Sequence, residues 1–70
     1  MFVLIDKKYE IDGQKLRDAR LECGLSQSSF ARKCRWSSAY QCRIETGIVT
    51  CINESTKNAI EKVLNTMKSP

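Results

Sequence analysis

The sequence contains no histidine, and its four cysteines are never close together in the chain. They are Cys23, Cys34, Cys42 and Cys51, so no C-x-x-C turn is present to chelate a zinc ion. We therefore expect no metal site and no other cofactor. We interpret the cysteines as small buried or half-buried thiols, and a disulfide or redox role is the alternative. Without histidine, a nucleophile–base pair or a glycine-rich phosphate loop, the sequence does not indicate an enzyme.

Long apolar runs are also missing. No run approaches the roughly 18 residues of a membrane-spanning helix, so we expect no membrane partner. The apolar run "FVLI" near the start is too short for the core of a signal peptide, which favours a cytoplasmic protein. A chain of 70 residues forms one domain with a small core, and such a domain is often stabilised by forming an oligomer.

Positive charge is concentrated in the middle of the chain. The net charge is +4. The cations of residues 13–35 outnumber Asp18 and Glu22, the acids of that segment, and they are Lys15, Arg17, Arg20, Arg32, Lys33 and Arg35. A basic segment of this kind indicates binding to nucleic acid or another anion, and a solvated basic surface is the alternative.

Candidate helix N-caps divide the chain after residue 11. These caps are Asp12, Ser26, Ser37 and Asn53. They predict a first helix that ends at Gly24, short helices over 27–33 and 38–45, a stop at Gly47 and a last helix. Tyr40 and Ile44 should face inward from the third helix. Residues 1–11 read as a strand or short hairpin.

The two short helices flank a tight turn, which is a helix-turn-helix layout. The stretch "LRDARLECGLSQSSFARKCRWSSAYQCRIETG", Leu16–Gly47, resembles the lambda-repressor-like (Cro/repressor) family of DNA-binding domains. "LRDAR", "GLSQ" and "SSAYQCRIETG" carry the resemblance in that order. We therefore predict an all-α bundle of four to five short helices, preceded by a short N-terminal strand or hairpin. The single domain, 1–70, comprises an arm (1–11), a core (12–47), and a loop with the C-terminal helix (48–70).

The resemblance implies that the third helix enters the DNA major groove. Its base-reading residues would then be Ser38, Ala39 and Arg43, and Arg43 suits guanine. Contacts to the DNA backbone, or support for the reading helix, would come from Arg17, Arg20, Gln27, Arg35 and Ser37. The resemblance also implies an ion pair between Arg20 and Glu45 that joins the first and third helices.

Some positions depart from the family pattern. Arg35 stands at a turn position where the family most often has glycine, and Trp36 replaces a smaller aliphatic residue. Gln41 stands where the family usually has an inward Ile or Val, so it either disturbs the packing or faces DNA or a partner. Ile48 and Val49 stand in a loop where relatives often carry basic residues. A protein partner could therefore bind through Gln41, Ile48 and Val49.

These observations predict a sequence-specific regulator of transcription that binds double-stranded DNA. It would be a repressor of the phage, plasmid or mobile-element type that acts by occupying an operator. We expect a homodimer, with "FVLI" and the last helix as candidate contact surfaces. The alternative is a protein-interaction module on the same fold, such as an antitoxin or an inhibitor of a host protein.

Overall fold

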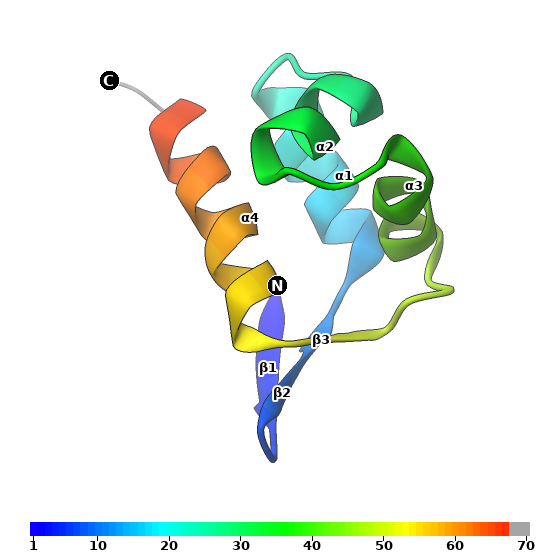
Figure 1. Cartoon of the computed structure of the whole chain (residues 1–70), viewed down its shortest axis with the longest axis vertical. Helices are drawn as coiled ribbons and strands as arrows, with labels where there is room; N and C mark the ends of the chain where they lie inside the picture. The colour runs from blue at the N-terminus through cyan, green and yellow to red at the C-terminus, as the bar shows by residue number, and fades with distance from the viewer. Residues whose placement is uncertain (68–70) are drawn as a thin grey trace.

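The computed structural model describes residues 1–67; residues 68–70, the end of the predicted domain, lie outside the described part. The described elements, in chain order, are β1 (Phe2–Ile5), β2 (Lys8–Ile11), α1 (Gly13–Glu22), α2 (Gln27–Cys34), α3 (Ser38–Thr46), β3 (Cys51–Ile52) and α4 (Glu54–Met67). Helices α1, α2 and α3 gather on one side, α4 lies beside α2, and the strands project from the other end (Figure 1).

The prediction of an all-α fold is wrong in one respect, because the strands form a three-stranded antiparallel sheet in the order β1-β2-β3. The hairpin was predicted, but its third strand was not. In β3, Ile52 pairs with Tyr9 and Cys51 pairs with Glu10. This pairing supplies backbone hydrogen-bond partners to the edge of β2 that faces away from β1. It also buries Ile52, which is only 3% exposed. The fold is therefore mixed, although it is largely helical.

The predicted helix starts are all confirmed by capping hydrogen bonds. Asp12 accepts from the Gln14 and Lys15 N–H groups at 3.0 and 3.3 Å. The Ser26 and Ser37 hydroxyls accept from Ser29 and Tyr40 at 3.1 Å each, and Asn53 Oδ1 accepts from Thr56 at 2.8 Å. Each cap satisfies an N–H group that has no partner within its helix. Helices α2 and α3 each end one residue later than predicted.

One hydrophobic core joins all four described helices to the sheet. Its most deeply buried apolar residues come from α1, α2, α3 and α4, and they are Leu16, Phe30, Ile44 and Ile60. Tyr40 was predicted to face inward with Ile44, but it is only half-buried. Its ring lies edge-on to that of Trp36, with the ring centroids 5.3 Å apart. Tyr40 therefore covers the border of the core rather than filling it.

Gly13 sets how closely α1 approaches α3. A Cβ atom added there would lie 2.7 Å from the carbonyl oxygen of Glu45, and nearer still to that of Ile44. Because both obstacles are backbone atoms, any larger residue would force the start of α1 away from the end of α3. This close approach brings the first and third helices near enough for their side chains to bond.

Candidate nucleic-acid interface

Helix α3 presents a continuous face of mostly short side chains to solvent. Ser38, Ala39 and Arg43, the residues predicted to read bases, are all exposed. Cys42 and Thr46 are exposed as well and share that face by their spacing of three and four residues, although sequence reasoning did not select them. The spacing alone could have identified both. The face thus consists of short side chains with one long cation near its C-terminal end.

The turn between α2 and α3 needs a left-handed backbone. Arg35 has φ 68° and ψ 37°, which explains why glycine suits this position and confirms the predicted turn. The Arg35 and Trp36 N–H groups donate to the Arg32 and Ala31 carbonyls at 3.1 and 3.0 Å, which closes α2. Three residues after α2, Ser37 caps α3. The side chain of Arg35 is exposed.

The predicted ion pair between Arg20 and Glu45 is present and buried. Arg20 Nε and Nη2 donate to the two carboxylate oxygens of Glu45 at 2.8 and 3.0 Å, a bidentate arrangement. Its Nη1 donates to the Leu25 carbonyl at 2.8 Å. The side chains are 7% and 2% exposed. Arg20 was also predicted to contact the DNA backbone, but its enclosed guanidinium leaves little surface for a phosphate, so its role here is structural.

Gln41 lies inside the protein, which corrects the prediction that it is available to a partner. Its exposure is 0%. The Gln41 side chain accepts a hydrogen bond from Trp36 Nε1 at 2.9 Å and donates one to Glu45 Oε2 at 2.6 Å. Two departures from the family pattern are thus linked, because the indole N–H of Trp36 finds its acceptor in the amide of Gln41. Such pairing is what a buried polar group requires.

Gln27 completes a network that ties three helices together. From the first turn of α2, its Nε2 donates to Glu45 Oε1 at 3.2 Å. Burial raises the pKa of Glu45, but the hydrogen bonds from Arg20, Gln41 and Gln27 outweigh burial, so this pKa lies below its ordinary value. Every buried side-chain N or O atom in the described part of the chain has a partner. The exposed face of α3 is therefore held from behind by α1 and α2.

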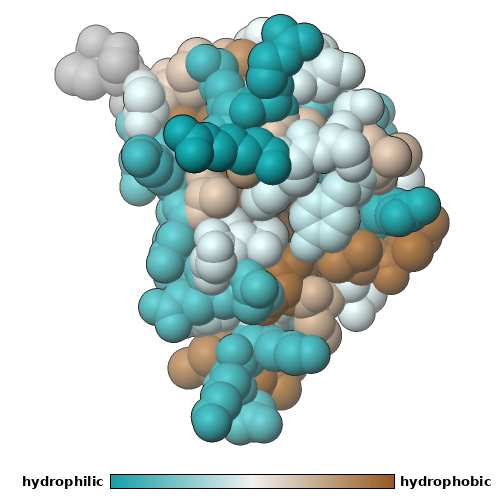
Figure 2. All heavy atoms as spheres, in the orientation of Figure 1, coloured by the Kyte–Doolittle hydropathy of each residue, from teal (hydrophilic) through white to brown (hydrophobic). Residues whose placement is uncertain are grey.

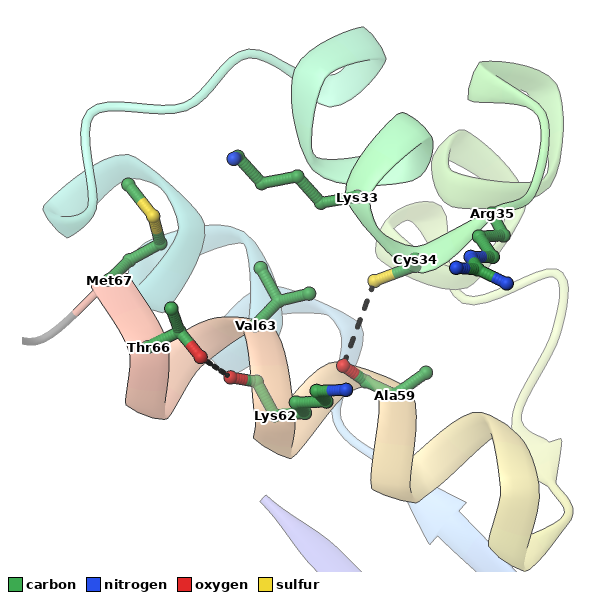
Figure 3. A pocket seen from close by; sticks show the side chains of 8 residues that line it. All are labelled: Lys33, Cys34, Arg35, Ala59, Lys62, Val63, Thr66 and Met67. Atoms are coloured by element: carbon green, nitrogen blue, oxygen red, sulfur yellow. Dashed lines mark hydrogen bonds between the residues drawn. The ribbon is translucent and has the colours of Figure 1, made fainter.

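Cations also lie on the surface of α1 and around a hollow between α2 and α4. Arg17 on α1, which was predicted to contact the DNA backbone, is exposed. Figure 3 shows Lys33 and Arg35 from the α2 side and Lys62 from α4, all lining the hollow between α2 and α4. Its lining contains no acidic residue. Cys34 lies in the same wall, with its Sγ 3.9 Å from the Ala59 carbonyl oxygen, and burial raises its pKa to about 11.

The loop after α3 offers less apolar surface than predicted. Ile48 is 75% exposed, whereas Val49 is half-buried and packs against the core. In Figure 2, hydrophobic atoms gather on the right, beside the loop that follows α3, and at the bottom, over the hairpin. Of the three residues proposed for a protein partner, only Ile48 therefore remains prominent on the surface.

Within residues 1–67, no group of three or more His, Cys, Asp or Glu side chains could hold a metal ion. No helix among these residues is both long and apolar enough to cross a membrane. Comparisons with models of protein families, with curated proteins and with solved structures find no match to this chain.

Proposed function

We propose that this protein is a sequence-specific regulator that binds double-stranded DNA through the exposed face of α3. It would act in the cytoplasm as a repressor by occupying an operator, as its resemblance to the Cro/repressor family implies. The observation that carries the proposal is the exposed face of α3, with its short side chains and Arg43, held by a buried network from α1 and α2. The helix-turn-helix is then the stretch from Gln27 to Thr46.

The shape of α3 supports reading in the major groove. An α-helix with side chains is about 10–12 Å wide, and the groove is about 12 Å wide. The short side chains of Ser38 and Ala39 let the start of the helix approach the bases closely. Arg43, one turn later, can donate two hydrogen bonds to guanine, and the Ala39 methyl can meet a thymine methyl.

The buried network supports the rigidity that base reading needs. Glu45 belongs to the helix that carries Arg43, and it is fixed by Arg20 from α1 and Gln27 from α2. A reading helix must hold its side chains to within a fraction of an ångström of the bases. The exposed cations Arg17 and Arg35 would meet phosphates, which add affinity without sequence preference.

The salt dependence of binding to a random-sequence duplex tests the proposal. With about four phosphate contacts, the affinity should fall roughly 150-fold between 50 and 200 mM salt. Arg35→Ala should reduce the slope of log affinity against log salt by about one unit. Lys8→Ala is the matched control, since it removes the same charge from the exposed hairpin and should leave the slope unchanged.

The alternative function, a protein-interaction module such as an antitoxin or an inhibitor of a host protein, draws on the exposure of Ile48. An isolated apolar side chain of this kind is common on protein surfaces. Weak duplex binding with a flat salt response, for the wild type and both variants, would put this alternative ahead of DNA binding.

A further inference from the structure

The free edge of β1 is the largest apolar feature left unused by the proposed function. Val3, Leu4 and Ile5 are 59%, 63% and 49% exposed, and β1 is an outer strand of the sheet. Proteins usually protect such an edge with charged residues, proline or a bulge. Phe2–Ile5 contains no charge and no proline. The other outer strand, β3, has only two residues.

The pairing of β1 with β2 shows which backbone groups are free. Met1 accepts from the Asp12 N–H at 3.2 Å, and Val3 stands opposite Glu10. Backbone groups in an antiparallel strand point alternately to the two sides. The backbone N–H and C=O groups of Met1, Val3 and Ile5 point toward β2. Those of Phe2 and Leu4 therefore point toward the open edge of the sheet.

We infer that a second copy of this chain covers the edge, by antiparallel pairing of the two β1 strands about a two-fold axis at Val3. In this register Phe2 stands opposite Leu4 of the partner subunit, and the two copies of Val3 stand opposite each other. Every contact is then apolar, and all the outward-facing backbone groups are paired. A shift of two residues would place Phe2 opposite Asp6, a charged turn residue.

A second copy fits this edge better than a different strand. The pairing is self-complementary, and it closes after two chains because each chain supplies its one long free edge. Directly opposed residues of antiparallel strands point to the same side of the sheet. Val3 and Ile5 of the two copies therefore form one apolar stripe on one face of the joined sheet. In Figure 1 the hairpin lies at the far end of the molecule from α2.

The dimer should be weak in isolation. Pairing of two four-residue strands buries much less than the about 1,600 Å² of a standard interface. We therefore expect a dissociation constant in the micromolar range from sedimentation equilibrium. The inference does not depend on DNA binding and its tests contain no DNA, so its failure and that of the proposed function are separate results.

Val3→Lys tests the surface, because a lysine on each copy would place like charges opposite each other at the axis. We expect sedimentation to show at least a tenfold weaker dimer. Leu21→Lys is the matched control: Leu21 is 55% exposed on α1, close to the exposure of Val3, and its change should leave association unaltered. Equal association of wild type and Val3→Lys, or a monomeric wild type at high concentration, would overturn the inference.

Introduced cysteines test the register independently of any loss of folding. The starting chain has Cys23, Cys42 and Cys51 changed to Ser and keeps only Cys34, which is buried. Opposed residues in a pair without hydrogen bonds have Cα atoms about 4.5 Å apart, within disulfide range. Val3→Cys should therefore form a covalent dimer on mild oxidation. Ile5→Cys should not, since its two copies would lie four positions apart, about 13 Å along the strands. Cross-linking through Ile5→Cys but not Val3→Cys would refute this pairing.

Discussion

The hydrogen bond between Trp36 and Gln41 predicts a measurable energetic coupling between two residues that the sequence presents as unrelated. Gln41→Met keeps the length of the side chain but removes both of its polar atoms. The indole N–H of Trp36 then loses its acceptor, and Glu45 keeps only the bonds from Arg20 and Gln27.

The expected loss follows from these two bonds. A hydrogen bond to a charged group contributes about 1.5–3 kcal/mol and a neutral one about 0.5–1.5 kcal/mol. Burial of the methionine thioether offsets part of the sum, so Gln41→Met should lower the free energy of unfolding by about 2–3 kcal/mol. A domain of this size is stable by about 3.5–10 kcal/mol, so the variant should still fold. Trp36→Phe should cost about 1–2.5 kcal/mol through the same bond and a smaller ring.

The test is a double-mutant cycle in which the stability of each variant is measured by urea unfolding, monitored by circular dichroism. Each single substitution loses the Trp36–Gln41 hydrogen bond, so the sum of the two losses in stability counts this bond twice. The double variant should therefore be more stable than that sum implies by about 0.5–1.5 kcal/mol. Tyr40→Phe is the control, because Tyr40 packs on the Trp36 ring without bonding Gln41, and it should add to Gln41→Met within about 0.5 kcal/mol. Simple additivity of Trp36→Phe and Gln41→Met would refute the bond.

Four further changes follow from the same structure. Because the pKa of Glu45 is lowered in the folded protein, this carboxylate stabilises the fold above its unfolded pKa of about 4.3, and the stabilisation is lost as the pH falls through the folded pKa. In urea unfolding, the free energy of unfolding of Glu45→Gln should therefore fall less steeply in acid than that of the wild type. Parallel pH curves for the two proteins would contradict this. Gly13→Ala should lower the melting temperature more than Gly24→Ala, because an added Cβ at Gly24 meets no atom and only the left-handed backbone, with φ 72°, opposes it. The reverse order would contradict the close approach of α1 to α3. Arg35→Gly should stabilise the fold by about 1 kcal/mol in the same assay by relieving the left-handed backbone, and no gain would show that this strain is absent. Cys34→Ser should lower the melting temperature while a chelator leaves the wild type unchanged; a drop with chelator would indicate a metal.

Sequence reasoning was most successful where local chemistry decides the structure. Side-chain caps act within three residues, so Asp12, Ser26, Ser37 and Asn53 marked the helix starts correctly. The positive φ of Arg35 agrees with the resemblance, which places this residue at a turn position where the family most often has glycine. The hairpin followed from a short β-rich segment, since its strands pair with their nearest neighbours.

Two of the features that sequence reasoning missed depend on contacts between distant segments, and a third depends on how two nearby side chains turn toward each other. The two residues of β3 carry too weak a pattern to indicate a strand, and only the free edge of β2 makes them one. Gly13 was not singled out in the sequence, because its need for a small residue arises only from the backbone of α3 packed against it. Gln41 was expected to disturb the packing or to face DNA or a partner, because the sequence does not show that the indole of Trp36 turns toward its amide.

DNA binding of two arginine variants tests the assignment of the reading face most directly. Arg43 lies on the exposed face of α3 and Arg17 on α1, and both are exposed. On a duplex selected from a random library, Arg43→Ala should cost about 1–3 kcal/mol and relax the preference at one base pair. Arg17→Ala should weaken binding to selected and scrambled duplexes alike, with a salt slope shallower by about one unit. If Arg43→Ala instead weakens both duplexes equally, or leaves both unchanged, α3 does not read DNA through this face.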